Sequence, residues 1–305
     1  MDQPQYHSKF GGLWIDRADW RQRMSALELS ANEIANLTQF VQQGYIIFEN
    51  AVSLDAIDAF QKEVERSFRE GNDKLLYQTH GDQTTRPLDH AVDRLGTRVV
   101  DSFVALPQAL KLFSTPRLVS FLQLIFAEDP LLFQSLSFDQ GSQQGLHQDT
   151  AYVVVNRPLE LAAVWIALED VKPGSGELMY SPGSHRLPDW DFGGNKKHWN
   201  SVTDGDQAHA DWAAFLRAEA GKPQHRTETF LPRKGDMLIW HADLAHGGSP
   251  VENTDLTRQS LVGHFCPQSA RPSYFDNGGR STVHHYGRLA YSSGHYDLAA
   301  AEPVA

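Results

Sequence analysis

The sequence predicts a mainly β fold, a β-sandwich or jelly roll, supported by helices at the N-terminal end. Two observations carry this prediction. Segments with helical spacing of apolar residues come first, and short β-branched or aromatic segments bounded by Gly, Pro or Asp follow from about residue 131. A run of helices followed by a run of strands is typical of such layered β folds. No glycine-rich strand–turn–helix phosphate motif occurs, so a Rossmann or P-loop fold has no support.

Three helices are expected before residue 131, each marked by its ends. The first begins with the capping-box pattern Ser30-x-x-Glu33, and a glycine ends it before the short strand YIIF. The second runs from a serine N-cap to a glycine over SLDAIDAFQKEVERSFREG. The third, TPRLVSFLQLIFAED, has a threonine cap and a proline in its first turn. Residues 1–29 are expected to form an arm over the surface, and residues 72–98 a long loop.

Six strands are expected in the second part of the chain. They are LLFQSLSF, AYVVV, LAAVWIALEDV, GELMYSP, GDMLIWHA and RQSLVGHFC. We expect one domain over residues 1–305, in which residues 1–130 supply the helical support and the loop. Residues 131–268 form the jelly-roll core, residues 186–230 are an insertion with its own helix, and residues 269–305 are a C-terminal tail.

The composition is that of an ordinary globular chain with an acidic balance. The formal net charge of −11 argues against nucleic acid or an anionic membrane as the main partner, but it allows a small-molecule substrate. No apolar stretch has the length of a signal peptide core or of a membrane span. Cys266 is the single cysteine, so a disulfide within the chain is impossible and a reducing, cytoplasmic setting is expected. The oligomeric state stays open.

The pattern His-x-Asp is the first candidate for a metal site. It occurs five times, beginning at residues 80, 147, 209, 241 and 295. The chain has 14 histidines and many aspartates, so the pattern by itself carries little weight, and a solvated turn explains most such pairs. Only His147-Asp149 and His241-Asp243 lie beside predicted strands, where ligands can be held rigidly.

The chemistry of iron separates these two pairs. A non-haem Fe(II) oxygenase needs two imidazoles and one carboxylate on one face of the metal. In a jelly roll, one strand end can supply two ligands, whereas the third comes from a distant strand that returns across the barrel. His246 lies far downstream of Asp149, and the next predicted strand carries Arg258 and Ser260. A guanidinium there can bind the far carboxylate of a dicarboxylate cosubstrate through two parallel hydrogen bonds.

The alternative pair, His241-Asp243, fits this chemistry poorly. The histidine that follows it closely is His246, which is too near in sequence to reach across a barrel. We therefore favour His147, Asp149 and His246 as the candidate ligands.

These motifs together resemble the phytanoyl-CoA dioxygenase family of Fe(II)/2-oxoglutarate-dependent oxygenases, a group that includes ectoine hydroxylase. The resemblance runs from about residue 32 to about residue 268. Its carriers are Gly44-Tyr45-Ile46, HQD at 147–149, VWIALED at 164–170, SPGSHR at 181–186, and His246 followed by Arg258. It implies that the jelly roll is a double-stranded β-helix of the cupin-like kind.

The resemblance implies roles for single residues. His147, Asp149 and His246 match the metal ligands and catalytic centre of the family. Arg258 matches the residue that binds the 5-carboxylate of 2-oxoglutarate, and Ser260 is a plausible helper. Arg258 lies one residue further from His246 than the family pattern has it, which a loop insertion absorbs.

Two more residues fall at cosubstrate positions of the family. Gln134 falls where an amide donor is often found, and Trp165 falls where an aromatic ring flanks the cosubstrate. Each has an ordinary alternative, because a glutamine can serve as a strand hydrogen-bond partner and a tryptophan in an apolar strand can belong to the core.

The function implied is that of a dioxygenase that uses Fe(II), 2-oxoglutarate as cosubstrate and O₂ to hydroxylate a small or mid-sized metabolite, with succinate and CO₂ as coproducts. Related halogenases lack the carboxylate ligand, so Asp149 favours hydroxylation, or a related desaturation or cyclisation, over halogenation. Two rivals stay open: a non-redox cupin-like metalloenzyme and a non-catalytic binding module on the same fold.

The substrate contacts are expected on the two segments that would cover the iron, residues 72–98 and 186–230. The candidates are Tyr77, Arg86, Trp190 and Trp199, which would suit a metabolite with apolar and anionic parts. The arginines of the first segment, which also include Arg94 and Arg98, have a solvated or salt-bridged place as their alternative.

Overall fold

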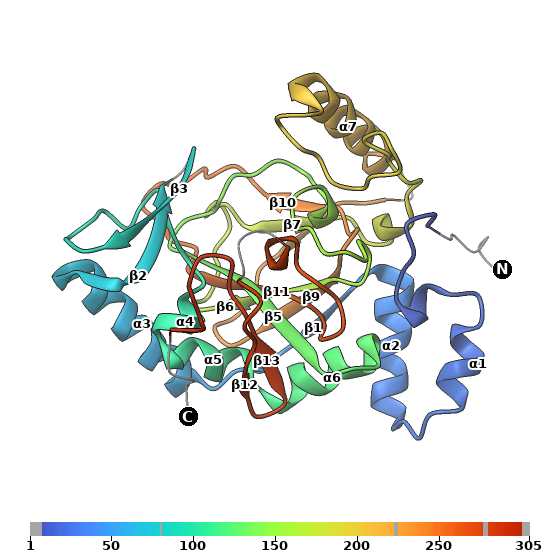
Figure 1. Ribbon diagram of the computed structural model, residues 1–305, viewed down its shortest axis with the longest axis horizontal. Helices are drawn as coiled ribbons and strands as arrows, with labels where there is room; N and C mark the ends of the chain where they lie inside the picture. Colours follow the sequence, from blue (N-terminus) through green and yellow to red (C-terminus); the bar gives the residue numbers. More distant parts are fainter. Residues whose placement is uncertain (1–7, 80, 223–224, 277–279, 301–305) are drawn as a thin grey trace.

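The computed structural model describes residues 8–79, 81–222, 225–276 and 280–300, and two β-sheets form its centre (Figure 1). The large sheet contains, in spatial order, β1 (Tyr45–Phe48), β9 (Met237–His241), β6 (Ala162–Ala167), β11 (Ser260–Pro267), β5 (Pro130–Phe138), β4 (Thr97–Val100), β2 (Asn72–Thr79) and β3 (Asp82–Leu88). At its side, β13 (Leu289–Tyr291) pairs with β5 and with β12 (His284–Tyr286). The small sheet contains β10 (His246–Gly248), β7 (Leu178–Tyr180) and β8 (Glu228–Phe230).

The two sheets pack face to face and enclose an apolar interior. Trp165 and Leu238 of the large sheet share one buried cluster with Leu178 and Phe230 of the small sheet. Every second residue of a strand points to the same face, so the interior receives alternate residues of β6, β9 and β11. The arrangement is a jelly roll, as the sequence predicts.

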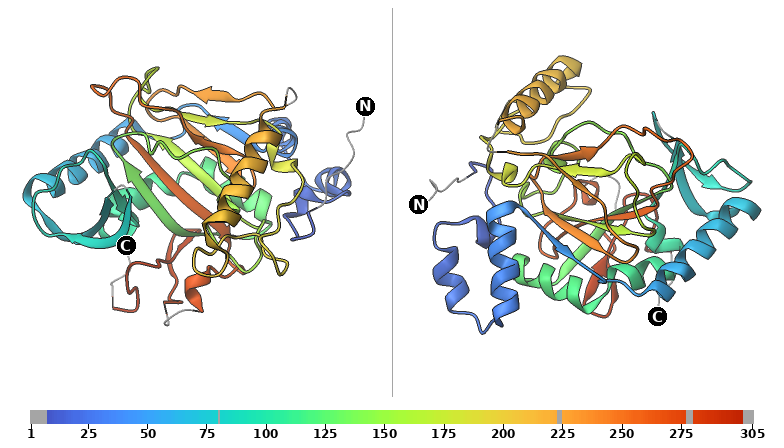
Figure 2. Two further views of the ribbon diagram at one scale, coloured as in Figure 1. Left: turned by 90° about the horizontal axis from the view of Figure 1, so that it is seen from above. Right: turned by 180° about the vertical axis from the view of Figure 1, so that it is seen from behind.

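Helices cover the other face of the large sheet, on the side opposite to the small sheet (Figures 1 and 2). They are α2 (Ala31–Gln43), α3 (Leu54–Glu70), α5 (Pro107–Phe113) and α6 (Pro116–Phe126). Phe60 and Leu122 of these helices belong to the main core cluster together with Ile166 and Leu261 of the sheet. Among the described helices, none alone is long and apolar enough to cross a membrane, although α5 and α6, bent by 61°, pass that test as a pair.

The end signals of α2, the first helix that the sequence predicts, are confirmed. The Glu33 carboxylate accepts a hydrogen bond from the Ser30 backbone N–H at 2.8 Å, and the Ser30 hydroxyl accepts one from the Glu33 backbone. Gly44 ends α2 with φ +78°, a conformation that favours glycine. A Cβ atom at Gly44 would also collide with the imidazole of His185. Gly44 thus ends α2, and its lack of a side chain allows the buried SPGSHR turn to pack closely against it.

The prediction of a long loop over residues 72–98 was wrong, because β2, β3 and the first half of β4 lie there and extend the large sheet at its edge. Strands at an edge keep polar residues on their solvent side, so they lack the apolar run on which the strand predictions rest. The C-terminal tail likewise contains β12 and β13, and β13 pairs in parallel with β5.

The prediction of a strand at AYVVV was also wrong. The backbone N–H groups of Tyr152 and Val153 turn back and donate to the Asp149 carbonyl at 2.8 and 2.7 Å. This closes the short 3-10 turn η2 (Asp149–Ala151) in place of an extended strand. The β-branched run is apolar because Val153 and Val155 pack in a small core cluster, which a sequence pattern does not distinguish from a strand.

The region before β5 holds two further short helices that the sequence patterns did not predict, α4 (Ser102–Ala105) and α5. The N-terminal arm contains a 3-10 turn, η1 (Trp14–Asp16), and α1 (Trp20–Ser25). The insertion carries α7 (Gly205–Ala220), close to the predicted helix, and this helix projects from the body of the molecule (Figure 1).

Candidate metal and cosubstrate site

The site is built on a direct backbone pairing of two histidines. His147 N–H donates to the His246 carbonyl at 2.8 Å, and His246 N–H donates to the His147 carbonyl at 2.9 Å. This antiparallel bridge joins the segment after β5 to the first residue of β10. It brings the two imidazole centroids to 4.3 Å, although 99 residues separate them (147 to 246).

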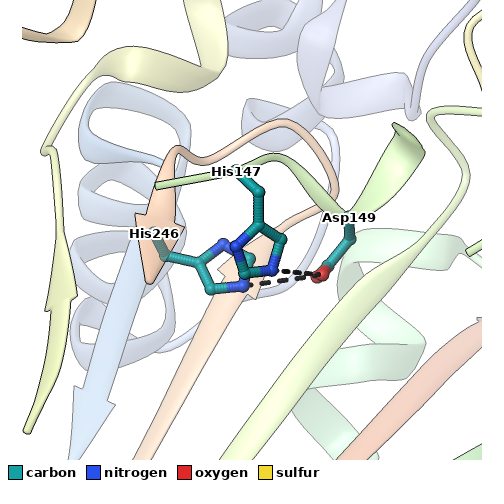
Figure 3. A group of neighbouring side chains, drawn as sticks. All are labelled: His147, Asp149 and His246. Atoms are coloured by element: carbon teal, nitrogen blue, oxygen red, sulfur yellow. Dashed lines mark ion pairs between the residues drawn. The ribbon is translucent and has the colours of Figure 1, made fainter. Parts of the chain in front are cut away.

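Both imidazoles are oriented by the same local device. His147 Nδ1 lies 2.8 Å from the Gly145 carbonyl, and His246 Nδ1 lies 2.9 Å from the Leu244 carbonyl. A carbonyl only accepts, so each Nδ1 carries the proton and each Nε2 keeps its lone pair for a metal. Figure 3 shows both rings directed at the carboxylate of Asp149.

Asp149 completes the cluster from the 3-10 turn that follows His147. Its Oδ1 lies 3.9 Å from His147 Nε2 and 3.5 Å from His246 Nε2 (Figure 3). Its Oδ2 accepts a 2.7 Å hydrogen bond from the indole N–H of Trp240, and His264 Nε2 lies 3.7 Å from the same oxygen. The two oxygens of one carboxylate thus have different surroundings.

The electrostatics of the cluster suit a cation. Burial lowers the pKa of His147 to about 3, so its imidazole is neutral near pH 7 and its Nε2 carries no proton that a metal would have to displace. Burial by itself would raise the pKa of Asp149, but the imidazoles of His246, His264 and His147 hold it well below its ordinary value. Among the described residues no Lys or Arg forms an ion pair with the buried Asp149 carboxylate, and a divalent metal would supply the positive charge that it lacks.

The three ligand atoms fit a metal ion of ordinary size. All of them lie within 4.8 Å of one another, and all three residues are buried. Neighbouring ligands around an ion with bonds of about 2.1 Å are about 3 Å apart, so the observed spacing needs only a small contraction. Two histidines and one carboxylate with open positions form the facial arrangement of non-haem iron sites. In the part of the chain that the structure describes, this is the group of metal-ligating side chains that stands out.

A cationic side chain lies just before β11, the strand that also carries His264 beside Asp149. Arg258 precedes β11, is 3% exposed, and donates from Nη1 to the Gly176 carbonyl at 3.0 Å. Its guanidinium carbon lies 5.6 Å from the ring of Trp165, and its Nε is buried without a hydrogen-bond partner. Burial lowers the pKa of Arg258 to about 10, so it stays charged near pH 7. A buried guanidinium with a free donor is suited to an anionic ligand.

Two further unpaired donors face the same interior. Ser260 is fully buried, and neither its hydroxyl nor the indole N–H of Trp165 has a partner. Ser260, Val262 and His264 alternate along β11 on the interior face, and Trp165 lies directly across from Val262 on β6. Ser260 and His264 are four residues apart, about 13 Å of strand, which separates the cationic end from the metal cluster. Buried polar atoms are seldom left without partners, so this row indicates a binding site for a ligand with several acceptors.

Gln134 belongs to the same face. It pairs with His264 across β5 and β11, so its side chain points into the interior rather than toward the helices. It is half-buried. This position is compatible with the amide donor that the family resemblance implies.

The rival pair, His241 and Asp243, has a structural role. His241 Nε2 lies 3.3 Å from Asp16 of the N-terminal arm, and its Nδ1 accepts the backbone N–H of Asp243. Asp243 forms an ion pair with the buried Lys197 at 2.5 Å. Neither residue joins the metal cluster. His80, of the first pair, lies outside the described residues.

Two of the candidate substrate residues lie away from the site. Tyr77 of β2 is 6% exposed and belongs to the main core cluster on the helix-covered face, because strand alternation directs it away from the interior. Arg86 forms an exposed ion pair with Asp82 at 2.6 Å. Arg94 is paired with Asp139. These residues take the ordinary alternatives, and we drop Tyr77 and Arg86 as substrate contacts.

Arg98 is the exception among these arginines. It lies across from Phe138 on the interior face, and its Nε donates to the Gln78 side chain at 2.9 Å. No ion pair joins it to a carboxylate of the described residues, and burial lowers its pKa. Arg98 therefore adds a positive charge to the interior.

The insertion contacts residues 147–152, which carry the first two candidate ligands and are called the metal loop below, through aromatic rings. The Tyr152 ring lies 5.7 Å from the His147 ring, and its hydroxyl bonds to His209 of α7 at 2.6 Å. Trp199 lies 4.6 Å from the His209 ring and donates its backbone N–H to the Ala151 carbonyl. Trp199 is thus close to the metal loop.

Trp190 has a different place. Its ring packs on Phe215 at 5.1 Å and on Phe192 at 6.3 Å, within the cluster that holds α7 to the body. It fits the role of a residue that fixes the insertion by burial, and it is a weaker candidate for substrate contact.

Sequence patterns missed three residues around the ligands: Trp240, His264 and Lys197. The first two sit on the interior face of β9 and β11, where alternation from Trp165 and Ser260 would have placed them. Lys197 is 4% exposed and bonds Asp189 at 2.7 Å as well as Asp243. Asp243 also accepts a hydrogen bond from Thr150, next to the metal ligand Asp149. Lys197 thus ties the insertion to the metal loop through buried charges.

Replacing Lys197 by methionine should destabilise the protein by about 3–5 kcal/mol, because it leaves the buried Asp243 carboxylate without its cation. Urea unfolding followed by circular dichroism measures this. The matched control is Lys196→Met, which removes the neighbouring and more exposed lysine and its pair with Asp204. Equal destabilisation by both variants would contradict the special role of Lys197.

The comparisons with known proteins agree with this geometry. The sequence profile of the phytanoyl-CoA dioxygenase family matches residues 40–260. The peroxisomal phytanoyl-CoA dioxygenase of Homo sapiens is 25% identical over 276 residues, which cover 82% of this chain and 73% of that protein. The mouse enzyme of the same name is 24% identical over 256 residues, with 77% and 69% covered.

Solved structures share the fold at lower identity. The epimerase SnoN in complex with Fe³⁺, alpha ketoglutarate and nogalamycin RO superposes with a TM-score of 0.60 at 18% identity, covering 85% of this chain and 98% of that one. EctD from S. alaskensis with 2-oxoglutarate and 5-hydroxyectoine gives 0.55 at 19% identity, with 80% and 78% covered. The family match spans most of the chain, and this protein belongs to the phytanoyl-CoA dioxygenase family, among the 2-oxoglutarate-dependent non-haem iron oxygenases.

Proposed function

We propose that this protein is a dioxygenase that hydroxylates a small or mid-sized metabolite, using Fe(II), 2-oxoglutarate and O₂ and releasing succinate and CO₂. The observation that carries the proposal is the pairing of two features on one interior: the His147, Asp149 and His246 cluster, and a buried cation with unpaired donors. Iron in this site would supply the activation of O₂, coupled to oxidative decarboxylation of the cosubstrate.

The metal would be held by His147 Nε2, His246 Nε2 and Asp149 Oδ1. The Nδ1 protons of the two histidines are hydrogen-bonded to backbone carbonyls, so neither imidazole can rotate without breaking this bond. The carboxylate at Asp149 occupies the position that related halogenases leave for chloride. This supports hydroxylation, or a related desaturation or cyclisation, rather than halogenation.

The cosubstrate would lie along β11 between the metal and Arg258. The guanidinium and the Ser260 hydroxyl would bind its far carboxylate, and the Trp165 indole and the Gln134 amide would donate along its length. The apolar cluster around Leu238 and Val262 excludes water from this space, which strengthens each of these interactions.

The two rival functions are less well supported. A non-redox metalloenzyme of the cupin-like kind needs the metal cluster but has no use for a buried arginine whose Nε has no hydrogen-bond partner. A binding module needs no cluster of buried ligands with lone pairs directed at one point. A binding module could use the unpaired donors of Arg258, Ser260 and Trp165, but it leaves the metal cluster without a function.

The substrate side is the least constrained part of the proposal. Trp199 and Tyr152 connect the insertion to the metal loop and are our candidates for apolar contacts, and Arg98 suits an acidic group. Screening metabolites for stimulated O₂ consumption would identify the substrate class. We also propose a cytoplasmic location, for which the single and buried Cys266 is the support.

Replacing His147, Asp149 or His246 by alanine should reduce Fe(II)-dependent formation of succinate from 2-oxoglutarate to background, because each change removes a ligand. The control is His241→Gln, which alters the rejected His-x-Asp pair and should retain succinate formation. Activity that survives in His147→Ala but is lost in a folded His241→Gln would contradict our choice of ligands.

Replacing Arg258 by glutamine should raise the 2-oxoglutarate concentration needed for half-maximal turnover by about 30-fold or more, since truncating one partner of a buried charge pair costs about 2–5 kcal/mol. The maximal rate should change less. Arg86→Gln removes an exposed arginine as the control and should leave this requirement unchanged. An unchanged requirement in Arg258→Gln would place the cosubstrate elsewhere.

A further inference from the structure

We propose that Trp240 is the positioning residue that makes Asp149 a one-oxygen ligand. Its indole N–H holds Oδ2 of the carboxylate, so that Oδ1 alone faces the two imidazoles. The inference rests on the proposed metal site, but it concerns how that site is shaped and can fail separately from it.

The first step is the asymmetry of the carboxylate. Oδ2 accepts the Trp240 hydrogen bond at 2.7 Å and has His264 Nε2 at 3.7 Å. Oδ1 lies 3.5 Å from His246 Nε2 and 3.9 Å from His147 Nε2. One side of the carboxylate therefore meets donors of the barrel wall, and the other meets the lone pairs that would bind the metal.

The second step is the rigidity of the donor. Trp240 is 2% exposed and lies in β9 between two neighbouring strands, with Tyr45 and Ala163 as its direct cross-strand partners. An indole has one N–H and no acceptor, so this ring can serve Asp149 only as a donor. A hydrogen bond to an ionised carboxylate is shorter and stronger than one between neutral groups.

The same ring also contacts a second ligand. The Trp240 and His246 ring centroids are 4.7 Å apart. Trp240 thus supports one ligand by a hydrogen bond and another by packing, from a strand that contributes no ligand of its own. A phenylalanine would keep much of the packing and lose the donor.

The consequence concerns the open positions of the metal. Carboxylates bind metals through one oxygen or through two. A carboxylate with Oδ2 committed to an indole binds through Oδ1, which leaves the facial set of three protein ligands and three open positions. Without the N–H, the carboxylate is free to rotate and to bring its second oxygen to the metal.

The test compares Trp240→Phe with Trp14→Phe in the full chain. Trp14 also donates one indole hydrogen bond, to the Leu124 carbonyl at 2.8 Å, but it lies in the N-terminal arm. Titration with Co²⁺ alone should show a dissociation constant raised about 10–100-fold in Trp240→Phe, with an altered visible band, because support of a ligand from outside the metal shell has this effect. Trp14→Phe should match the unmodified chain in both.

The outcomes separate the two proposals. Failure of the unmodified chain to bind Co²⁺ would overturn the metal site itself. Binding in the unmodified chain, with the same affinity and spectrum in a folded Trp240→Phe, would overturn the role of Trp240 alone.

A second measurement covers the case in which Trp240→Phe does not fold. Indole ¹⁵N–¹H spectra of the chain, which has seven tryptophans, should contain one proton signal that moves upfield in Asp149→Ala and shifts when Zn²⁺ is added to the unmodified chain. The absence of any such signal would overturn the inference.

Discussion

The two backbone hydrogen bonds between His147 and His246 are the interaction on which the rest of the site depends. They join the segment after β5 to the start of β10, and so connect the large sheet to the small one at the point where the imidazoles meet. Each histidine also donates its Nδ1 proton to the backbone carbonyl of the residue two positions earlier, and this directs both Nε2 atoms at Asp149. Loss of these two hydrogen bonds would move His147 and His246 apart even though both side chains stayed the same.

The interior of the jelly roll combines a packed apolar wall with a row of buried donors that lack partners. The Arg258 Nε, the Ser260 hydroxyl and the Trp165 indole each carry the free-energy cost of an unsatisfied buried group, about 1–3 kcal/mol in other proteins. A ligand that offers carboxylate and keto oxygens along β11 would offset that cost. These unpaired donors support the proposed placement of the cosubstrate along β11, where the apolar wall around them would exclude water and so strengthen its binding.

The sequence predicts the jelly roll from β-branched strands between turn residues. It predicts the metal ligands from a His-x-Asp pair that gains weight only together with the distant His246 and with Arg258 at the start of the next predicted strand. It fails where polarity hides a strand, as in β2 and β3, and where an apolar run after Asp149 turns back on itself. Tyr77 shows a second limit, since a side chain in a strand faces the core or the site according to a register that a single sequence leaves open. Trp240 and Lys197 show a third, because their partners Asp149 and Asp243 lie in distant segments that only the folded chain brings together.

The most direct test of the metal and cosubstrate site is an anaerobic titration of the purified chain with Fe(II) and 2-oxoglutarate, followed by visible absorption. Chelation of iron by the 1-carboxylate and keto oxygen of 2-oxoglutarate in this site predicts a weak charge-transfer band that saturates at one equivalent of iron and needs both components. A folded chain that gives no band under these conditions would contradict the account.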